Sequence, residues 1–327
     1  MNHLLSIEDL SRAEIEAILD RAESFAEVGR RDIKKVPTLR GRTVVTLFYE
    51  SSTRTSSSFE LAAKRLSADL VSVKAAGSSV DKGESLKDTV ATLSAYDPAA
   101  IVIRHPYAGA AQMVSRWTSA AVVNAGDGKH EHPSQALLDV YTLLEHLGPL
   151  DGKRIWIVGD VLHSRVARSC IRAFALMGAE VTVAGPPTLI PRGIEELGCE
   201  VSFTLEEIGE ADVVYGLRMQ RERMNDSFVP SLREYAINYQ LNSRRLNPRQ
   251  LVMHPGPVNR GVEISPELMD GPASLITAQV ASGLVVRMAV LYEVLAGGER
   301  PRSGRAEAPA GAPAAAPPPV PPMGEPA

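Results

Sequence analysis

The chain has 327 residues, which at roughly 150 residues per domain corresponds to about two domains. Hydrophobic residues make up 44% and charged residues 23%, an ordinary globular composition that excludes disorder for most of the sequence. The formal net charge is -4 and aromatic residues make up only 5%, so neither a basic field nor stacking platforms favour nucleic acid as a partner.

The cysteine content and the hydropathy of the chain indicate the cellular compartment in which the protein is expected. The two cysteines, Cys170 and Cys199, lie outside any His/Cys cluster, which indicates neither a disulfide framework nor a metal site and favours a reducing cytoplasm. The longest apolar stretch, residues 278–296, is interrupted by charged side chains, so no membrane-spanning segment is predicted. Residues 301–327 are rich in Pro and Ala without periodicity, and we expect a disordered tail over 298–327.

Predicted helices and strands alternate along the first half of the chain. The first helix starts at a capping box formed by Ser11 and Glu14, and apolar residues then recur at helical spacing, unlike those of a signal peptide. Strands are predicted at 43–48, 70–73, 100–104 and 121–123, with helices at 59–66, 86–95, 110–115 and 133–147. This alternation is typical of a mostly parallel sheet with helices on both faces.

The second half repeats the alternation after a turn at residues 148–153. Strands are predicted at 154–158, 180–184, 211–215 and 250–253, and a last helix at 278–295. The predicted fold class is therefore α/β, with two doubly wound domains that we place at 1–148 and 149–277. In such sheets ligands bind beyond the carboxyl ends of the strands.

The residues after strand 43–48 form the first candidate site. Ser52, Thr53, Arg54 and Thr55 stand at a helix start, where free backbone N–H groups, hydroxyl donors and a guanidinium suit a phosphate. The alternative is an ordinary Ser/Thr helix cap followed by a solvated arginine. No G-x-x-x-x-G-K motif is present, which disfavours nucleotide triphosphate hydrolysis.

Other strand ends carry cations and amides as well. They supply, in chain order, Arg104, His132, Gln135, Arg165, Arg218 and Gln220. Cationic side chains at the strand ends of the second half favour a ligand with one or two carboxylates. The G-x-G-x-x-G motif of dinucleotide-binding sheets is missing, which argues against an NAD-dependent dehydrogenase.

Assembled in order, these segments closely resemble the aspartate carbamoyltransferase family over residues 1–298. The shared series is Ser52-Thr53-Arg54-Thr55, Lys82-Gly83-Glu84, Arg104-His105-Pro106, His132-Pro133-Ser134-Gln135, His163-Ser164-Arg165, Arg218-Met219-Gln220 and His254-Pro255-Gly256-Pro257. The resemblance implies a carbamoyl-phosphate domain at 1–148, an aspartate domain at 149–277, and a last helix, 278–297, that returns to the first domain. No cofactor is expected, because the leaving phosphate can accept the amine proton.

The resemblance also implies roles for individual residues. The phosphate would be held by Ser52, Thr53, Arg54, Thr55 and Arg104. The carbamoyl oxygen would accept from Thr55, Arg104 and His132, and Gln135 would hold the carbamoyl nitrogen. The catalytic residues would be Arg54, Thr55, Arg104 and His132. The aspartate would be bound by Lys82, Arg165, Arg218, Gln220, Gly256 and Pro257.

Ser78 and Lys82 belong to a polar loop that alone would indicate solvated surface. In the family the equivalent loop enters the active site of the neighbouring subunit, so the resemblance implies a homotrimer with shared active sites. Whether regulatory chains or dihydroorotase also bind stays open. We expect closure of the two domains over the substrates, with Glu50 and the second-domain arginines as a latch.

Two alternative functions fit the sequence less well than this resemblance. Ornithine carbamoyltransferase shares the phosphate motif, but its cationic substrate needs acidic contacts and a His-Cys-Leu-Pro segment, where this chain has residues 254–257 as His-Pro-Gly-Pro. A non-catalytic anion-binding protein would not need Lys82, His132 and Gln135 together.

Two positions depart from the family pattern. Ser56 stands where many members have arginine, and Gly256 stands where some have leucine. We expect the first change to alter packing beside the phosphate loop, and the second to leave aspartate contact there to backbone groups. His163 is left outside the predicted catalytic set.

Overall fold

The first helix begins where its sequence predicts. In the computed structural model, which describes residues 1–74, 83–220 and 228–296, α1 spans Arg12–Gly29 and both hydrogen bonds of the capping box are present. Its buried stripe consists of Ile15, Ile18, Leu19, Ala22, Phe25 and Val28. Because α1 packs against α9 (Ile276–Leu295), the N-terminal segment is part of the core.

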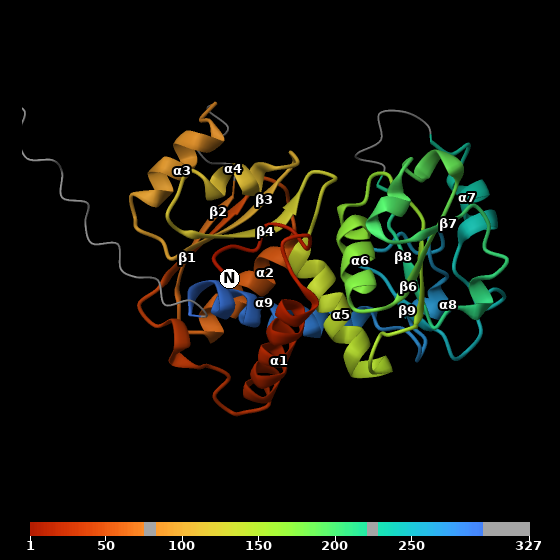
Figure 1. Ribbon diagram of the computed structural model, residues 1–327, viewed down its shortest axis with the longest axis horizontal. Helices are drawn as coiled ribbons and strands as arrows, with labels where there is room; N and C mark the ends of the chain where they lie inside the picture. Colours follow the sequence, from red (N-terminus) through yellow and green to blue (C-terminus); the bar gives the residue numbers. More distant parts are fainter. Residues whose placement is uncertain (75–82, 221–227, 297–327) are drawn as a thin grey trace, which may run out of the picture.

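A four-stranded parallel sheet forms the centre of the first half. Its strands are β1 (Thr43–Phe48), β2 (Asp69–Lys74), β3 (Ala100–His105) and β4 (Ala121–Asp127), in the order β2-β1-β3-β4. One face packs on α1, α2 (Thr53–Arg65), α5 (Pro133–Leu147) and α9 (Figure 1). The other packs on α3 (Leu86–Ser94) and α4 (Ala110–Ser115). Helices therefore cover both faces, as predicted.

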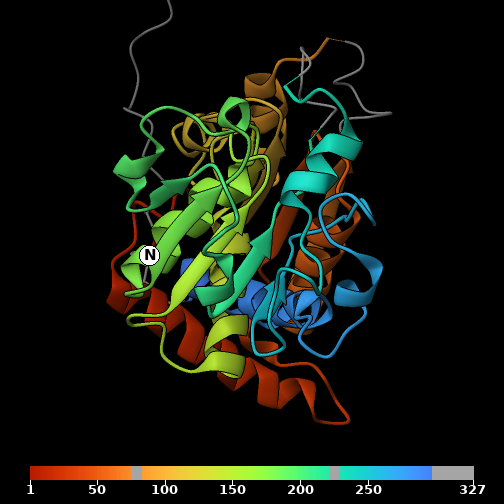
Figure 2. The same cartoon turned by 90° about the vertical axis from the view of Figure 1, so that its right-hand side faces the viewer.

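A five-stranded parallel sheet forms the centre of the second half and faces the viewer in Figure 2. Its strands are β5 (Arg154–Val158), β6 (Glu180–Ala184), β7 (Glu200–Ser202), β8 (Val213–Gly216) and β9 (Leu251–Met253), in the order β7-β6-β5-β8-β9. One face packs on α6 (Arg165–Leu176), and the other on loops and α8 (Pro266–Met269). The helix α7 (Leu232–Tyr239) lies outside this layer, over a small cluster of its own.

The last helix, α9, returns to the first half of the molecule. Among the described helices it alone is long and apolar enough to cross a membrane, but 61% of its most apolar window is buried inside the fold. It packs against α1, α2 and α5, as the family resemblance implies (Figure 1). Its apolar character therefore serves the core of the protein.

Both sheets contain a topological switch point, where successive connections leave in opposite directions. In the first sheet this point lies between β1 and β3, and in the second between β5 and β8. Crevices beyond the carboxyl ends of strands at a switch point are the usual ligand sites of such sheets. The fold class is thus confirmed as α/β with two parallel sheets, and it directs the search for a site to these four strand ends.

Candidate active site

A cavity of about 1190 Å³ lies where the two switch points face each other. Its cationic lining residues are Arg54, Arg104, Lys129, Arg165, Arg218 and Arg287. Among the residues that the structure describes, Glu50 is the only acidic one in the lining. Such an excess of positive charge in a partly enclosed space favours small anionic ligands.

The N-terminus of α2 contributes the segment predicted to bind phosphate. Ser52 caps the helix, and its Oγ accepts a hydrogen bond from the backbone N of Thr55 at 3.4 Å. The hydroxyl of Thr55 lies 3.5 Å from Nε2 of His132. The hydroxyl of Ser56 donates to the carbonyl of Ser52 at 2.7 Å, so this departure from the family bonds within its own helix. Thr53 and Arg54, which belong to the first turn of the helix, also line the cavity, and the N–H groups of such a turn have no partners within the helix.

Glu50 joins the two halves of the site. One of its oxygens, Oε2, accepts from Nε of Arg104 at 3.2 Å and also from Nη2 of Arg165. Arg104 lies one residue before the end of β3, whereas Arg165 begins α6 after β5 and is 3% exposed. Nη1 of Arg165 donates to the carbonyl of Gly128 at 3.2 Å. The ion pair between Glu50 and a second-half arginine is the contact expected of the latch.

His132 immediately precedes α5 and is held by its backbone. Its N–H donates to Oγ of Ser169 at 2.8 Å, and that hydroxyl donates to the buried carboxylate of Glu131 at 3.2 Å. Within the first turn of α5, Nε2 of Gln135 donates to Asp139 at 3.1 Å. The first turn of α5 therefore presents an imidazole and a carboxamide to the cavity from fixed backbone positions.

The loop after β8 carries the second-half residues Arg218 and Gln220. Its backbone is fixed at two points, because Met219 N donates to Glu263 Oε1 at 2.8 Å and Gln220 N donates to Asp160 Oδ2 at 3.2 Å. Both Arg218 and Gln220 line the cavity. A guanidinium and a carboxamide opposite the phosphate segment suit a carboxylate-bearing ligand.

The loop after β9 closes the cavity through His254 and Gly256. Nδ1 of His254 accepts from the backbone N of Gly256 at 2.8 Å, and burial together with the nearby Arg54 and Arg218 lowers the pKa of His254 to about 3. This imidazole is therefore neutral at physiological pH. Gly256 has a φ of +60°, and a Cβ built there would lie 2.4 Å from Nη2 of Arg54. The glycine at position 256 thus allows the backbone of this loop to approach the Arg54 guanidinium closely.

The structure brings most of the predicted site residues together. Those that line the cavity are Ser52, Thr53, Arg54, Thr55, Arg104, His132, Gln135, Arg165, Arg218, Gln220, Gly256 and Pro257. The predicted neighbour-contributed residues Ser78 and Lys82 lie outside the described residues, as does the predicted tail 298–327. His163 is 1% exposed, bonds Asp160 at 2.8 Å and packs edge-on against Phe228, which is a structural role.

Two cationic lining residues were missed by the sequence analysis. Lys129 follows β4 in the same loop that leads to His132, so its position after a strand end was a usable signal. Arg287 lies in the middle of α9 and is 4% exposed, and burial lowers its pKa to about 10. An arginine inside so apolar a helix was the available indication that α9 borders a polar site.

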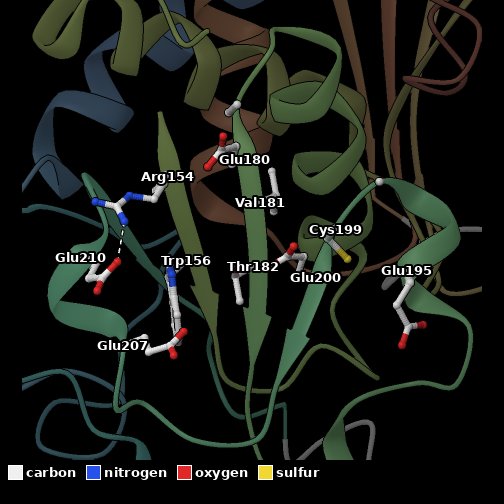
Figure 3. A pocket seen from close by; sticks show the side chains of 12 residues that line it. Arg154, Trp156, Glu180, Val181, Thr182, Glu195, Cys199, Glu200, Glu207 and Glu210 are labelled. Carbon is white, nitrogen blue, oxygen red and sulfur yellow. Dashed lines mark hydrogen bonds and ion pairs between the residues drawn. The ribbon is translucent and has the colours of Figure 1, made fainter. Parts of the chain in front are cut away.

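A second, smaller hollow of about 530 Å³ lies beside β5, β6 and β7 (Figure 3). It is lined by five glutamates, Glu180, Glu195, Glu200, Glu207 and Glu210. Arg154, its cation, is already paired with Glu210 at 2.6 Å. The excess of negative charge repels anions, so this groove does not suit an anionic ligand. Within the described ranges, no group of three or more His, Cys, Asp or Glu is arranged to hold a metal ion.

Comparisons with known proteins agree with the geometry. Residues 2–145 match the family model "Aspartate/ornithine carbamoyltransferase, carbamoyl-P binding domain", and residues 151–294 match its "Asp/Orn binding domain". The aspartate carbamoyltransferase catalytic subunit of Acidothermus cellulolyticus is 55% identical over 95% of this chain and 97% of its own length. That of Pelotomaculum thermopropionicum is 56% identical over 91% of this chain and 97% of its own.

Solved structures show the same similarity. Aspartate transcarbamoylase from Trypanosoma cruzi, in complex with carbamoyl phosphate, superposes with a TM-score of 0.82 at 31% identity, covering 90% of this chain and 96% of that one. The catalytic subunit of M. jannaschii aspartate transcarbamoylase superposes with a TM-score of 0.80 at 35% identity, covering 91% of this chain and 99% of that one.

Two facing parallel sheets with a cation-lined cavity at their switch points define an α/β enzyme that handles small anionic substrates. The sequence and structural matches make the class specific. The chain belongs to the aspartate/ornithine carbamoyltransferase family, among its aspartate carbamoyltransferase catalytic subunits.

Proposed function

We propose that the chain transfers the carbamoyl group of carbamoyl phosphate to the amino group of L-aspartate, a step of pyrimidine biosynthesis, in the cytoplasm. The observation that carries this proposal is the charge of the cavity, where six cations face one acid among the described lining residues. Carbamoyl phosphate and aspartate are both anionic, whereas ornithine carries a cationic side chain. The lining therefore favours aspartate over ornithine as the acceptor.

In the proposed reaction, the phosphate segment at α2 and Arg104 hold the leaving group. The lone pair of the neutral amine attacks the carbamoyl carbon, a C–N bond forms, the C–O bond to phosphate breaks, and the amine proton passes to the departing phosphate. Thr55, Arg104 and His132 donate to the carbamoyl oxygen as its charge grows. Preorganised donors of this kind usually make the largest single contribution to lowering the activation barrier. The transfer of the amine proton to phosphate needs no cofactor.

We assign the two substrates to different parts of the chain. Residues 1–148 together with the C-terminal helix hold carbamoyl phosphate, and residues 149–277 hold aspartate through Arg165, Arg218, Gln220 and the loop at Gly256 and Pro257. The family resemblance supports a homotrimer in which Ser78 and Lys82 of one subunit complete the site of the next.

An assay with two acceptors tests the proposal. Purified protein is mixed with carbamoyl phosphate and either L-aspartate or L-ornithine, and the carbamoylated product is identified. We expect N-carbamoyl-L-aspartate and no citrulline; citrulline alone would overturn the assignment of the acceptor, and no product from either would favour an anion-binding protein.

A pair of variants links the activity to the cavity. Arg54→Ala removes a donor to the phosphate and should lower turnover by about 100-fold or more, with the fold intact. Arg244→Ala, which changes an exposed arginine outside the cavity, is the matched control and should leave turnover unchanged. Near-normal turnover of the Arg54 variant would contradict the assigned site.

A further inference from the structure

A buried carboxylate lies directly behind the active-site cavity. Asp139 is 0% exposed and accepts hydrogen bonds from four side chains. Its Oδ1 accepts from Nε2 of Gln135 at 3.1 Å and from Nε2 of Gln279 at 2.7 Å. Its Oδ2 accepts from the hydroxyl of Tyr215 at 2.7 Å and from Sγ of Cys170 at 3.4 Å. Every oxygen lone-pair region of this carboxylate is thus occupied by a protein donor.

The four donors come from four different elements. Gln135 is on α5, Cys170 on α6, Tyr215 on β8 and Gln279 on α9. All four elements also lead to the cavity: Gln135 and Gln279 line it, α6 begins at the lining residue Arg165, and β8 ends at the loop of Arg218. Asp139 is therefore bonded to both halves of the molecule at the point where their substrate-binding segments meet.

The bond to Asp139 fixes which end of the Gln135 carboxamide faces the cavity. An ionised carboxylate only accepts, so the group that Gln135 turns toward Asp139 must be its NH₂ group. The acceptor oxygen, Oε1, is consequently the end left for the cavity. A carbamoyl NH₂ group is a donor and needs an acceptor at this place.

A second chain of hydrogen bonds leads from Asp139 to the loop after β9. Gln279 donates to Asp139 through Nε2, and by the same reasoning its Oε1 is the end that accepts from the backbone N of His254 at 3.0 Å. Nδ1 of His254 in turn accepts from the backbone N of Gly256. Asp139 thus fixes Gln135 directly, and it fixes the loop at Gly256 indirectly, through Gln279 and His254.

We infer that Asp139 is a positioning residue, which turns Oε1 of Gln135 toward the carbamoyl NH₂ group. Through Gln279 and His254, it also holds the Gly256 loop in a fixed position relative to Gln135. This inference rests on the proposed function, since it takes carbamoyl phosphate as the ligand. Arg287 on α9 provides the nearby positive charge, and Cys170 and Tyr215 are the other titratable groups that face the carboxylate. Burial raises the pKa of Asp139 to about 6, which leaves it mainly ionised at neutral pH.

The affinities for two ligands distinguish a positioning role of Asp139 from a general structural role. Inorganic phosphate occupies only the phosphate segment, whereas carbamoyl phosphate also presents the NH₂ group. Asp139→Asn lets Gln135 turn its NH₂ group toward the cavity. By titration calorimetry we expect carbamoyl phosphate to bind about tenfold more weakly, or about 1.4 kcal/mol, while phosphate binding stays within about twofold. Equal weakening of both ligands, or of neither, would overturn the inference.

A matched control and a double-mutant cycle complete the test. Cys170→Ser keeps a donor beside Asp139 and should leave both affinities unchanged. Gln135→Ala should weaken carbamoyl phosphate selectively, and Asp139→Asn should then add less than about twofold in that background, because both changes remove one interaction. Full additivity would contradict the inference.

The outcomes distinguish the inference from the proposed function. If Gln135→Ala does not weaken carbamoyl phosphate selectively, the proposed role of Gln135 fails. If it does so but Asp139→Asn has no selective effect, only the inference about Asp139 fails. Should Asp139→Asn not fold, Asp139→Ser, which leaves room for a water molecule at the carboxylate position, is measured with the same two ligands and judged by the same criteria.

Discussion

At the scale of single residues, Glu50 is the side chain on which the two halves of the site converge. Glu50→Gln keeps the size of the side chain and an acceptor oxygen, but it removes the negative charge that pairs with the guanidinium groups of Arg104 and Arg165. Because both ion pairs are largely shielded from solvent, we expect kcat/KM for aspartate to fall by about 30-fold or more. Steady-state kinetics at saturating carbamoyl phosphate measures this loss.

The control for this change is Glu210→Gln. Glu210 also pairs with an arginine, Arg154, but the side chains of that pair are 68% and 48% exposed. An exposed ion pair of this kind contributes little free energy, so kcat/KM of the Glu210→Gln variant should equal that of the wild type. If kcat/KM for aspartate falls equally in the two variants, the loss does not depend on shielding of the ion pair from solvent.

His254 makes a pH-dependent contribution to stability. Its pKa falls from 6.5 to about 3 on folding, so between these values the unfolded chain binds more protons than the folded one. Stability from this group is therefore full above pH 6.5 and is lost as the pH falls toward 3. Asp139, whose pKa rises from 3.8 to about 6, has the opposite slope between those two values.

Comparing the wild type with His254→Asn isolates this contribution, because Asp139 is present in both. Asparagine keeps an acceptor for the backbone N of Gly256 but does not titrate. We expect the variant to be less stable at pH 7, and the difference in unfolding free energy to narrow by up to about 1.4 kcal/mol per pH unit below pH 6.5. Thermal unfolding at pH 7, 6 and 5 measures it; a constant difference would contradict the assigned pKa.

At the scale of elements, the capping box of α1 ties a local sequence signal to stability. Ser11→Ala removes the side chain that accepts from the backbone N of Glu14. We expect a cost of about 1 kcal/mol and a lower unfolding temperature. Ser24→Ala, in the same helix but away from its start, is the control and should have a smaller effect. Unchanged unfolding of the Ser11 variant would show that α1 frays before the rest unfolds.

Most helices and strands could be predicted because the local propensity of their residues and their packing in the fold favour the same structure. β1, α5 and β5 have the predicted bounds, since each is a strongly apolar segment that ends at turn residues. α2 starts at Thr53 rather than residue 59, because its first turn is a Ser/Thr run whose weak helix propensity is offset by the Ser52 cap. β7 was missed, since a three-residue edge strand carries almost no periodic signal.

The site was predictable to the extent that it follows strand ends. Parallel sheets bring residues after different strands to one edge, which is why Arg54, Arg104 and Arg218 could be grouped without coordinates. Arg287 and Asp139 could not be grouped with them, because both lie inside helices and reach the site only through the packing of α9 and α5. An arginine within an apolar helix indicates a polar neighbour, but the sequence does not tell which residues that neighbour contains.

At the scale of the whole molecule, the proposed shared site predicts complementation between two inactive variants. Arg54→Ala and Lys82→Ala each damage a different part of the site. In randomly mixed trimers, roughly one site in four receives an intact Arg54 from one subunit and an intact Lys82 from its neighbour.

Mixing the two variants after reversible dissociation should therefore restore about a quarter of the wild-type activity. Each variant dissociated and reassembled alone is the control and should remain inactive. No recovery from a mixture shown to contain hybrid trimers would mean that both residues serve the same subunit's site, or that Lys82 has no role in it.

The substrate cavity and the groove beside β5, β6 and β7 carry opposite charge, which affects how fast an anion reaches the site. The chain bears a net charge of -4, yet its substrate cavity is cationic and the groove beside β5, β6 and β7 is acidic. A diffusing anion is repelled by the groove and drawn toward the cavity, which steers its approach. The association rate of carbamoyl phosphate should accordingly fall as added salt shortens the Debye length from roughly 30 Å at about 0.01 M to roughly 3 Å at about 1 M.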